Sequence, residues 1–348
     1  MNTKTTAPAS AAGTGRAWTA RLMAGLERRP WLLPLASFVV GWAGYLLIER
    51  GPALARWVAL LALLSWPWML LDHLFGRWLQ RASKGRLSPR LTAFVTQSVQ
   101  QEMLFFALPF VLGALRMSLE HVLFGLLLAA AALFSTLDPL YHRWAGRGGS
   151  GLGIAFQAYC TFITALVVLP LALHLPVERA VPVAVLIALL ALAAGLPRLF
   201  WRGAGRSPRE LLPVAAIAVL LLLGLPLRAW IPPAGLKLTE ARISQSIQAL
   251  EPGPERRQLS SAELSQGVVA YVAVHAPAGL SQPLRFDWYL DGRRLDSIPA
   301  RIEGAPGRGW RTYTRKQHFP VLAQGHWRVD LRTPGDQLIG RLYFEVLP

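Results

Sequence analysis

Long apolar runs separated by short polar loops occupy the first two-thirds of the chain. The segment from Trp31 to Ile48 reads WLLPLASFVVGWAGYLLI and contains no charged residue. An α-helix needs about 20 such residues to cross about 30 Å of hydrocarbon. The pattern therefore predicts seven transmembrane helices, at residues 31–48, 53–71, 91–114, 119–137, 153–173, 180–197 and 211–231.

From residue 232 onward the apolar and polar positions alternate, which is typical of β-strands. The dipeptide Asp291-Gly292 separates two such runs and is a strong signal for a two-residue hairpin. Residues 251–265 are polar and Pro-rich and are expected to form a loop. We expect six or seven strands from the runs at 241–250, where a helix fits nearly as well, and at 267–275, 284–290, 293–302, 308–316, 325–333 and 337–346.

These patterns predict a membrane α-helical bundle followed by a C-terminal all-β, immunoglobulin-like antiparallel sandwich. The expected parts are a disordered basic cytoplasmic N-terminus (1–30), a polytopic transmembrane domain (31–231) and an extracytoplasmic β-sandwich domain (232–348). A cleaved signal peptide is the alternative for the first apolar run. No small-residue cleavage site follows that run, so we expect an uncleaved first helix.

Basic residues are concentrated in alternate loops. Sixteen Lys and Arg lie on the side of the N-terminus and five on the opposite side. Because basic loops stay in the cytoplasm, the N-terminus is expected inside, and an odd number of spans then places the C-terminal domain outside. Residues 1–231 carry 21 Lys and Arg against 8 Asp and Glu, so the excess charge lies beside the lipid bilayer. Nucleic acid is not expected as a partner.

Polar residues interrupt the third and fifth predicted spans. Glu102 lies near the midpoint of the third span, with Gln97 and Gln101 beside it, and the fifth span offers Gln157 and Thr161 at comparable depth. A carboxylate in hydrocarbon costs at least about 2.5–3.5 kcal/mol, so it should face other helices or water. These residues either form interhelical hydrogen bonds or mark a proton or substrate path; a third alternative is that the polar stretch lies at the membrane interface.

A second polar group lies at the expected cytoplasmic ends of spans two and four. Asp72 and His73 close the second span, and Asp138 and His142 close the fourth. The last two are four residues apart, so a helix would place them on one face, in reach of a metal ion or a substrate. Pro139 could end the helix before that face forms. A metal site needs three or four ligands, so none is expected here.

Common catalytic and nucleotide-binding motifs do not occur in the sequence. It contains no HExxH, Walker, GxSxG or dinucleotide-binding pattern, and the only cysteine is Cys160, within the fifth span. No cofactor is expected, and catalytic residues stay unassigned. An enzyme is therefore the less favoured class of protein.

Aromatic and basic side chains stand out in the C-terminal domain. Trp288, Trp310 and Trp327 fall on different expected strands and either fill the core or form a surface for a glycan or a lipid-linked ligand.

Arg311 and Arg315 are an even number of positions apart on one strand and so share a face. With Arg328 and Arg332 nearby they either bind an anionic partner or form a solvated strand face.

Several motifs can be compared with known families. The tail contains FDWY at 286–289, GWRTYTRK at 309–316, GHWRV at 325–329 and GRLYF at 340–344. The helical part contains QE at 101–102, FFALPF at 105–110 and DPLY at 138–141. Together they resemble a family of bacterial inner-membrane proteins of unknown function that end in a small domain of unknown function. The resemblance implies an inner-membrane location with a periplasmic C-terminal domain, and no particular activity.

Three hypotheses for the function follow. The favoured one is a membrane-anchored binding or accessory protein whose periplasmic sandwich contacts a periplasmic protein, a glycan or a lipid-linked ligand. The second is a transporter or an intramembrane enzyme that acts on a lipid-linked substrate, with Glu102 in the membrane core. The unequal spans show no inverted repeat, which many transporters display. The third is a membrane sensor.

Overall fold

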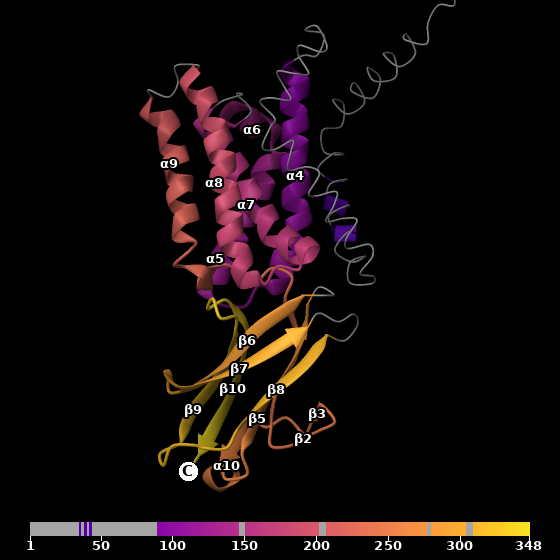
Figure 1. Ribbon diagram of the computed structural model, residues 1–348, viewed down its shortest axis with the longest axis vertical. Coiled ribbons are helices and arrows are strands. Elements are labelled where there is room, and N and C mark those ends of the chain that lie inside the picture. Colours follow the sequence, from indigo (N-terminus) through magenta and orange to yellow (C-terminus); the bar gives the residue numbers. More distant parts are fainter. Residues whose placement is uncertain are drawn as a thin grey trace, which may run out of the picture.

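The protein consists of a helical unit and a β unit stacked end to end (Figure 1). The computed structural model describes residues 35, 38, 39, 42, 43, 89–145, 150–201, 207–276, 280–303 and 309–348. All described helices longer than one turn precede residue 232, and all strands follow it. The predicted order of a helical part followed by a β-rich part is confirmed.

The helices begin and end close to the predicted spans. They are α4 (Pro89–Ala114), α5 (Leu119–Thr136), α6 (Asp138–Trp144), α7 (Gly151–Leu173), α8 (Val177–Trp201) and α9 (Pro208–Leu223). The last predicted span extended to residue 231, but α9 ends earlier, and a short 3-10 helix, η2 (Arg228–Trp230), follows after a turn.

Three of these helices are long and apolar enough to cross a membrane: Leu119–Thr136, Gly151–Leu173 and Val177–Phe200. The other long helix, α4, carries the polar run of the third predicted span, and α9 has 16 residues, fewer than the about 20 that a crossing needs. The predicted spans 31–48 and 53–71 lie almost wholly outside the described residues. The number of seven transmembrane helices therefore stays a prediction.

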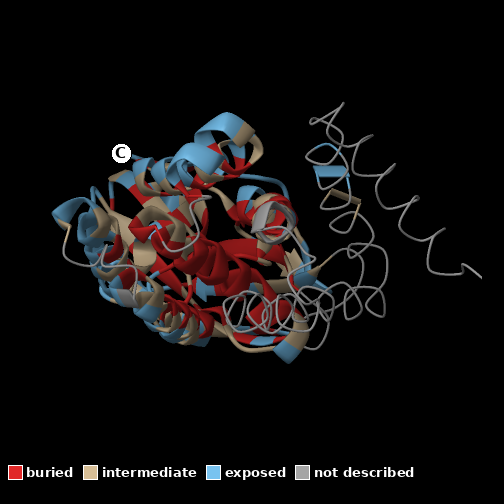
Figure 2. Cartoon of the chain, turned by 90° about the horizontal axis from the view of Figure 1, so that it is seen from above, coloured by how far each residue is buried: buried red, intermediate tan, exposed pale blue. Residues whose placement is uncertain are grey.

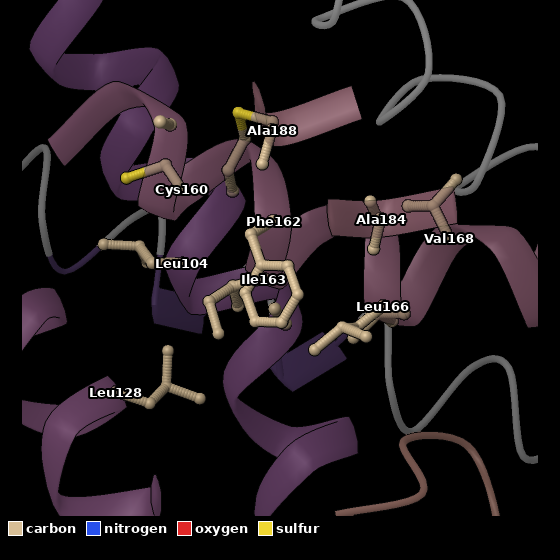
Figure 3. Packing of buried hydrophobic residues seen from close by; sticks show 14 of the residues in the cluster. Leu104, Leu128, Cys160, Phe162, Ile163, Leu166, Val168, Ala184 and Ala188 are labelled. Atoms are coloured by element: carbon tan, nitrogen blue, oxygen red, sulfur yellow. The ribbon is translucent and has the colours of Figure 1, made fainter. Parts of the chain in front are cut away.

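Helix α7 lies at the centre of the helical unit, packed against α4, α8 and α9. Within its most apolar window 83% of the residues are buried. Ala184 and Ala188 of α8 are fully buried and allow α8 to approach α7 closely; Figure 3 shows Ala184 next to Val168. Cys160 is buried in this cluster as well. Seen from above, buried residues gather at the centre and exposed ones at the rim (Figure 2).

The rim of the helical unit is apolar too. Large side chains on the outer faces of α5 and α8, among them Leu126, Leu133, Leu186 and Leu190, are more than half exposed. A helix of a water-soluble bundle carries polar residues on its outer face, because exposed apolar surface is unfavourable in water. A unit that is apolar both inside and outside is suited to a hydrocarbon surrounding.

The β unit contains two main sheets. The strands are β1 (Lys237–Ser244), β2 (Ile247–Gln248), β3 (Glu251–Pro252), β4 (Gln258–Ser260), β5 (Val268–His275), β6 (Ser281–Leu290), β7 (Arg293–Glu303), β8 (Trp310–Lys316), β9 (Gly325–Arg332) and β10 (Leu338–Leu347). One sheet has the order β1-β5-β8, and the other has the order β4-β10-β9-β6-β7. A separate two-stranded sheet joins β2 and β3.

Two details of the predicted β domain are wrong. Residues 251–265, expected as a loop, contain β3, β4 and a one-turn helix, α10 (Ser261–Leu264). The β4 strand pairs in parallel with β10, so the five-stranded sheet is mixed rather than wholly antiparallel. Such short elements carry no periodic signal, since β4 is ordered by the edge of the strand that it joins. The immunoglobulin-like class stays a prediction.

The two sheets enclose one hydrophobic core. Trp288 and Trp327 are fully buried in it, and the ring of Trp327 stacks on Phe344 at a centroid distance of 5.7 Å. The indole Nε1 of Trp327 donates a hydrogen bond to the carbonyl of Ala323 at 2.8 Å. Trp310, by contrast, is 36% exposed, because it begins β8 at the edge of its sheet.

The hairpin predicted from Asp291-Gly292 is confirmed. It joins β6 to β7, and both residues have positive φ, 45° and 85°. Two successive residues in this region form the tight turn whose twist matches that of paired strands.

The helical unit and the β unit are joined by buried hydrogen bonds. The backbone N–H of Val177, at the start of α8, donates to Gln282 Oε1 at 2.8 Å, and the side chain of Val177 belongs to the core of the β unit. Gln337 Nε2 donates to the carbonyl of Ile231 at 3.1 Å. The two units therefore meet in a specific interface.

Candidate functional site

The described residues contain two groups of polar side chains that could do chemistry or bind a ligand. The first, the glutamine cluster, lies between α4 and the corner that joins α5 to α6. It consists of Gln97, Gln100, Gln101, Ser135, Asp138 and Tyr141. The three glutamines and Tyr141 are each 3% exposed or less.

Hydrogen bonds connect α4 to the corner. Gln97 Nε2 donates to Asp138 Oδ1 at 2.8 Å and to the carbonyl of Ser135 at 3.0 Å. That carbonyl also accepts a hydrogen bond from Gln101 Nε2. Ser135 lies in the last turn of α5, where carbonyls lack partners within the helix. Gln97 and Gln101 therefore supply the hydrogen-bond donors for a carbonyl in the last turn of α5, and the cluster fixes the angle between α4 and α5.

One atom of the glutamine cluster lacks a hydrogen-bond partner in the described part of the chain. Gln101 Oε1 is buried and has no hydrogen-bond partner among the described residues. A buried acceptor without a donor is unfavourable by about 1–3 kcal/mol.

Tyr141, in contrast, donates its hydroxyl hydrogen to Gln100 Oε1 at 2.7 Å. Gln101 Oε1 is therefore the one buried side-chain atom of the cluster that has no hydrogen-bond partner among the described residues.

The predicted intramembrane residues separate into buried and exposed ones. Gln97 and Gln101 are buried, and Gln97 donates to the half-buried Asp138, which the sequence places in the second polar group. Glu102 is exposed and is not part of the cluster, so the buried polar positions of α4 are Gln97, Gln100 and Gln101. On α7, Gln157 and Thr161 are buried.

The polar groups of α7 are satisfied partly within the helix. Thr161 Oγ1 donates to the carbonyl of Gln157 at 2.9 Å, and Thr164 Oγ1 does the same to Cys160.

The predicted cytoplasmic-end residues do not form a metal site in the described part of the chain. Asp138 and His142 lie in α6, which begins at Asp138 with Pro139 in its first turn, so the proline starts a helix instead of ending one. His142 is exposed, while Asp138 is turned to Gln97. Among the described residues no three His, Cys, Asp or Glu side chains could hold a metal ion. Asp72 and His73 lie outside the described residues.

The second group is the arginine face, on the side of the five-stranded sheet that points away from the core. It consists of Arg285, Asp287, Arg328, Asp330, Arg332, Asp336 and Arg341. Asp287 of β6 and Asp330 of β9 are directly paired across the two strands, so their side chains share this face. Both carboxylates are completely buried by the long side chains around them.

Asp330 is surrounded by three guanidinium groups. The distances from its carboxylate oxygens are 2.7 Å to Arg341 Nε, 2.8 Å to Arg332 Nη2 and 3.3 Å to Arg328 Nε. Over the whole face, four arginines stand against three aspartates, which leaves an excess of one positive charge. The arginine side chains remain between 17% and 31% exposed, so their outer edges are open to a ligand.

At the other end of the arginine face, Arg285 forms ion pairs with two aspartates. Its guanidinium is 3.1 Å from Asp287 and also pairs with Asp336. Burial lowers the pKa of Arg285, but the hydrogen bond and the charge of Asp287 outweigh burial, and the net effect raises it.

Arg341 behaves in the same way, because its bond to Asp330 outweighs the effect of burial and raises its pKa. The guanidinium groups of Arg285 and Arg341 therefore stay charged.

Arg328 is the least satisfied member of the arginine face. Its guanidinium lies over the ring of Tyr289, 4.2 Å from the ring centroid, which is a favourable cation–π contact. Its Nε is buried and has no hydrogen-bond partner among the described residues, although Asp330 is close. That Nε therefore faces Asp330 and not the solvent, and the exposed part of the Arg328 side chain, 31% of it, is the part that a ligand can reach.

The other predicted arginines lie on a different sheet. Arg311 and Arg315 share one face of β8, as predicted, but β8 belongs to the three-stranded sheet and not to the sheet that carries Arg328. Arg311 pairs with Glu251, and Arg315 donates to the carbonyl of Gln266. The expectation that these residues join Arg328 and Arg332 in one basic patch is therefore wrong.

Sequence reasoning missed five residues of the arginine face: Arg285, Asp287, Asp330, Asp336 and Arg341. A signal was available, because the segments RFD at 285–287 and RVDLR at 328–332 place charges of opposite sign at every second position of a strand. Such spacing puts the charges on one face of a sheet, where they can pair.

Comparison with known proteins gives a family but no activity. Residues 14–270 match the Family of unknown function DUF5924, and residues 281–346 match the Protein of unknown function DUF2914. No curated protein and no solved structure matches the chain. The two matches agree with the resemblance drawn from the sequence motifs, namely to a family of unknown function that ends in a small domain of unknown function. Since the first match covers well over half of the chain, the protein belongs to the DUF5924 family.

Proposed function

We propose that the protein is a multi-pass protein of the bacterial inner membrane that presents its β unit in the periplasm as a binding module for an anionic component of the envelope. The observation that carries this proposal is the arginine face, with its excess of positive charge. The immunoglobulin-like sandwich and the seven transmembrane helices predicted from the sequence are part of the proposal.

The position of the β unit supports the periplasmic side. The β unit lies at the end of the helical unit where α5 begins and α9 ends, away from α6 and from the start of α9 (Figure 1). The basic residues Arg143 and Arg209 lie at that far end, and cytoplasmic loops are the ones enriched in Lys and Arg. If the far end is cytoplasmic, the β unit is outside.

The chemistry of the arginine face supports an anionic ligand. A guanidinium group presents several N–H donors in one plane, which matches the oxygens of a phosphate or carboxylate. Asp330 and Asp287 hold the arginines in position, so little side-chain freedom would be lost on binding. The buried aspartates thus orient the binding groups and leave the face with a net positive charge.

A direct test compares two matched arginine substitutions in the full chain, reconstituted in discs of zwitterionic lipid. Titration with glycerol phosphate, a soluble phosphate monoester, should give weaker binding for Arg328→Gln than for the wild type. The control is Arg311→Gln, which removes the same charge from the opposite sheet and should bind as the wild type does. Equal binding by all three proteins, or by none, would refute the proposal.

The side of the membrane needs its own test. A reporter fused to the C-terminus, active only outside the cytoplasm, should be active. A cytoplasmic C-terminus would overturn the predicted number of spans together with the proposed location.

A second candidate function is that of a transporter or intramembrane enzyme for a lipid-linked substrate. The observation that favours it is the buried, unpaired Oε1 of Gln101 within the helical unit. It predicts that a chain truncated after Pro232 still rescues a deletion phenotype and that Gln101→Leu does not. The favoured function predicts the reverse.

A further inference from the structure

An apolar groove runs along the helical unit between α5 and α9, with α7 as its floor. Its volume is about 680 Å³. None of the described residues that line it is charged, and many are large and apolar, among them Phe124, Phe134, Phe156, Ile217 and Leu220. A cavity with such a lining suits a hydrocarbon chain and offers almost nothing to a compact polar ligand.

The groove is long and parallel to the helices. On α5 its lining extends from Phe124 to Phe134, and on α9 from Pro213 to Leu223. Ten residues of α-helix rise about 15 Å, which is roughly half of the about 30 Å hydrocarbon thickness of a bilayer. The groove is therefore long enough to take about half of the length of a bilayer's hydrocarbon layer, and it runs along the helices.

The described part of the N-terminal segment does not cover the groove. Phe38 makes an edge-to-face contact with Phe105 at a centroid distance of 5.7 Å. Phe105 belongs to α4, and no residue of α4 lines the groove.

One polar atom inside the groove lacks a partner. The hydroxyl of Tyr159 on α7 is buried and has no hydrogen-bond partner among the described residues. A buried hydroxyl without a partner is unfavourable, but a hydrocarbon chain has no acceptor to offer it, so this atom does not select the ligand.

The outer end of the groove lies beside the arginine face. Ile231, which lines this end of the groove, accepts a hydrogen bond through its carbonyl from Gln337 Nε2 at 3.1 Å, and Gln337 directly follows Asp336 of the arginine face.

Trp230 closes the same end of the groove and is 41% exposed. Tryptophan is typical of the level of lipid headgroups. A molecule in the groove would therefore place its head near guanidinium groups.

We infer that the groove holds the hydrocarbon chain of a lipid with an anionic phosphate headgroup, and that the arginine face receives this headgroup. The inference rests on the proposed function, because it names the ligand of the arginine face. The complementarity is twofold: an apolar channel for the chain and an excess of positive charge, near Arg332 and Arg341, for the phosphate.

The experiment uses the full chain, stripped of lipid in detergent, and measures by native mass spectrometry the retention of three added probes. The probes are phosphatidic acid, phosphatidylcholine and glycerol phosphate. Ala216→Phe and Ala130→Phe each fill the groove from a different wall, and both alanines are exposed, so folding should be preserved. Ala193→Phe is the control, on an exposed position of α8 outside the groove.

We expect both groove variants to retain about tenfold less phosphatidic acid than the wild type and Ala193→Phe, with glycerol phosphate binding unchanged. Arg328→Gln should weaken the binding of the two phosphate monoesters, phosphatidic acid and glycerol phosphate.

Equal retention by the groove variants and the control would overturn the groove as the chain site, and loss of glycerol phosphate in Arg328→Gln would then still support the proposed function. Equal retention of phosphatidylcholine and phosphatidic acid would overturn the headgroup assignment. A dimer that Ala216→Phe dissociates would mean that a second copy occupies the groove.

Discussion

Replacing Asp330 by Asn should destabilise the β unit by about 3 kcal/mol. The carboxylate of Asp330 is completely buried and lies within 3.3 Å of nitrogen atoms of three arginines. The amide has nearly the same shape, so the change removes the charge and little else. Breaking a buried ion pair costs about 3–5 kcal/mol, because the partner charge is left without compensation. We expect the lower end of that range, since the arginines are partly exposed and water screens them.

Hydrogen exchange of the backbone amides of β9 and β10, measured on the full chain, tests this value. A loss of about 3 kcal/mol should accelerate exchange from the opened state about a hundredfold. The control is Asp336→Asn, which removes a carboxylate that is 62% exposed on the same face and should change exchange by less than about fivefold. If both variants exchange at similar rates, Asp330 is not the counter-ion that holds the arginine face together.

Three further predictions concern single contacts. The hydrogen bond from Lys316 lowers the pKa of Asp296 from its ordinary 3.8. The small contribution of this carboxylate to stability is therefore present above pH 4 and is lost as the pH falls through the lowered pKa. Asp296→Asn should remove that part of the acid sensitivity in a pH titration of unfolding. Tyr141→Phe leaves Gln100 Oε1 without its donor and should lower the free energy of unfolding by about 1–2 kcal/mol in a thermal denaturation series, whereas an unchanged melting curve would contradict the glutamine cluster. Gly292→Ala adds a Cβ that meets no atom within 4 Å, so only the positive φ of 85° opposes it, and a loss of about 1 kcal/mol in the same series is expected.

The elements of this fold were largely predictable because they follow from local patterns. Helices α5 and α7 begin and end within two residues of the predicted bounds, since the bounds of an apolar run are visible in the sequence. The hairpin at Asp291-Gly292 was predictable because few residue pairs accept two positive φ angles in succession. The short strand β4 was not predictable, because its order comes from the edge of β10 and not from its own three residues.

The candidate sites were predictable only in their residue types. The sequence singled out Gln97, Gln101 and Glu102 as neighbours along α4, but the helix turns the glutamines inward and Glu102 outward. It also suggested that Arg311 and Arg328 share a basic patch, whereas the chain places them on two different sheets. Which of several adjacent polar residues is buried depends on the rotation of a helix about its axis, and packing alone sets that rotation.

The sequence by itself determined that apolar helices precede a β-rich unit, where most elements begin and end, and which loops are basic. These properties depend on composition and on the periods of the helix and the strand. Only the tertiary structure decided that Asp330 is buried beneath three arginines and that α5, α7 and α9 leave a groove beside them. The physical reason is that burial, charge pairing and cavities arise between residues far apart in the chain, and no local pattern specifies which of them meet.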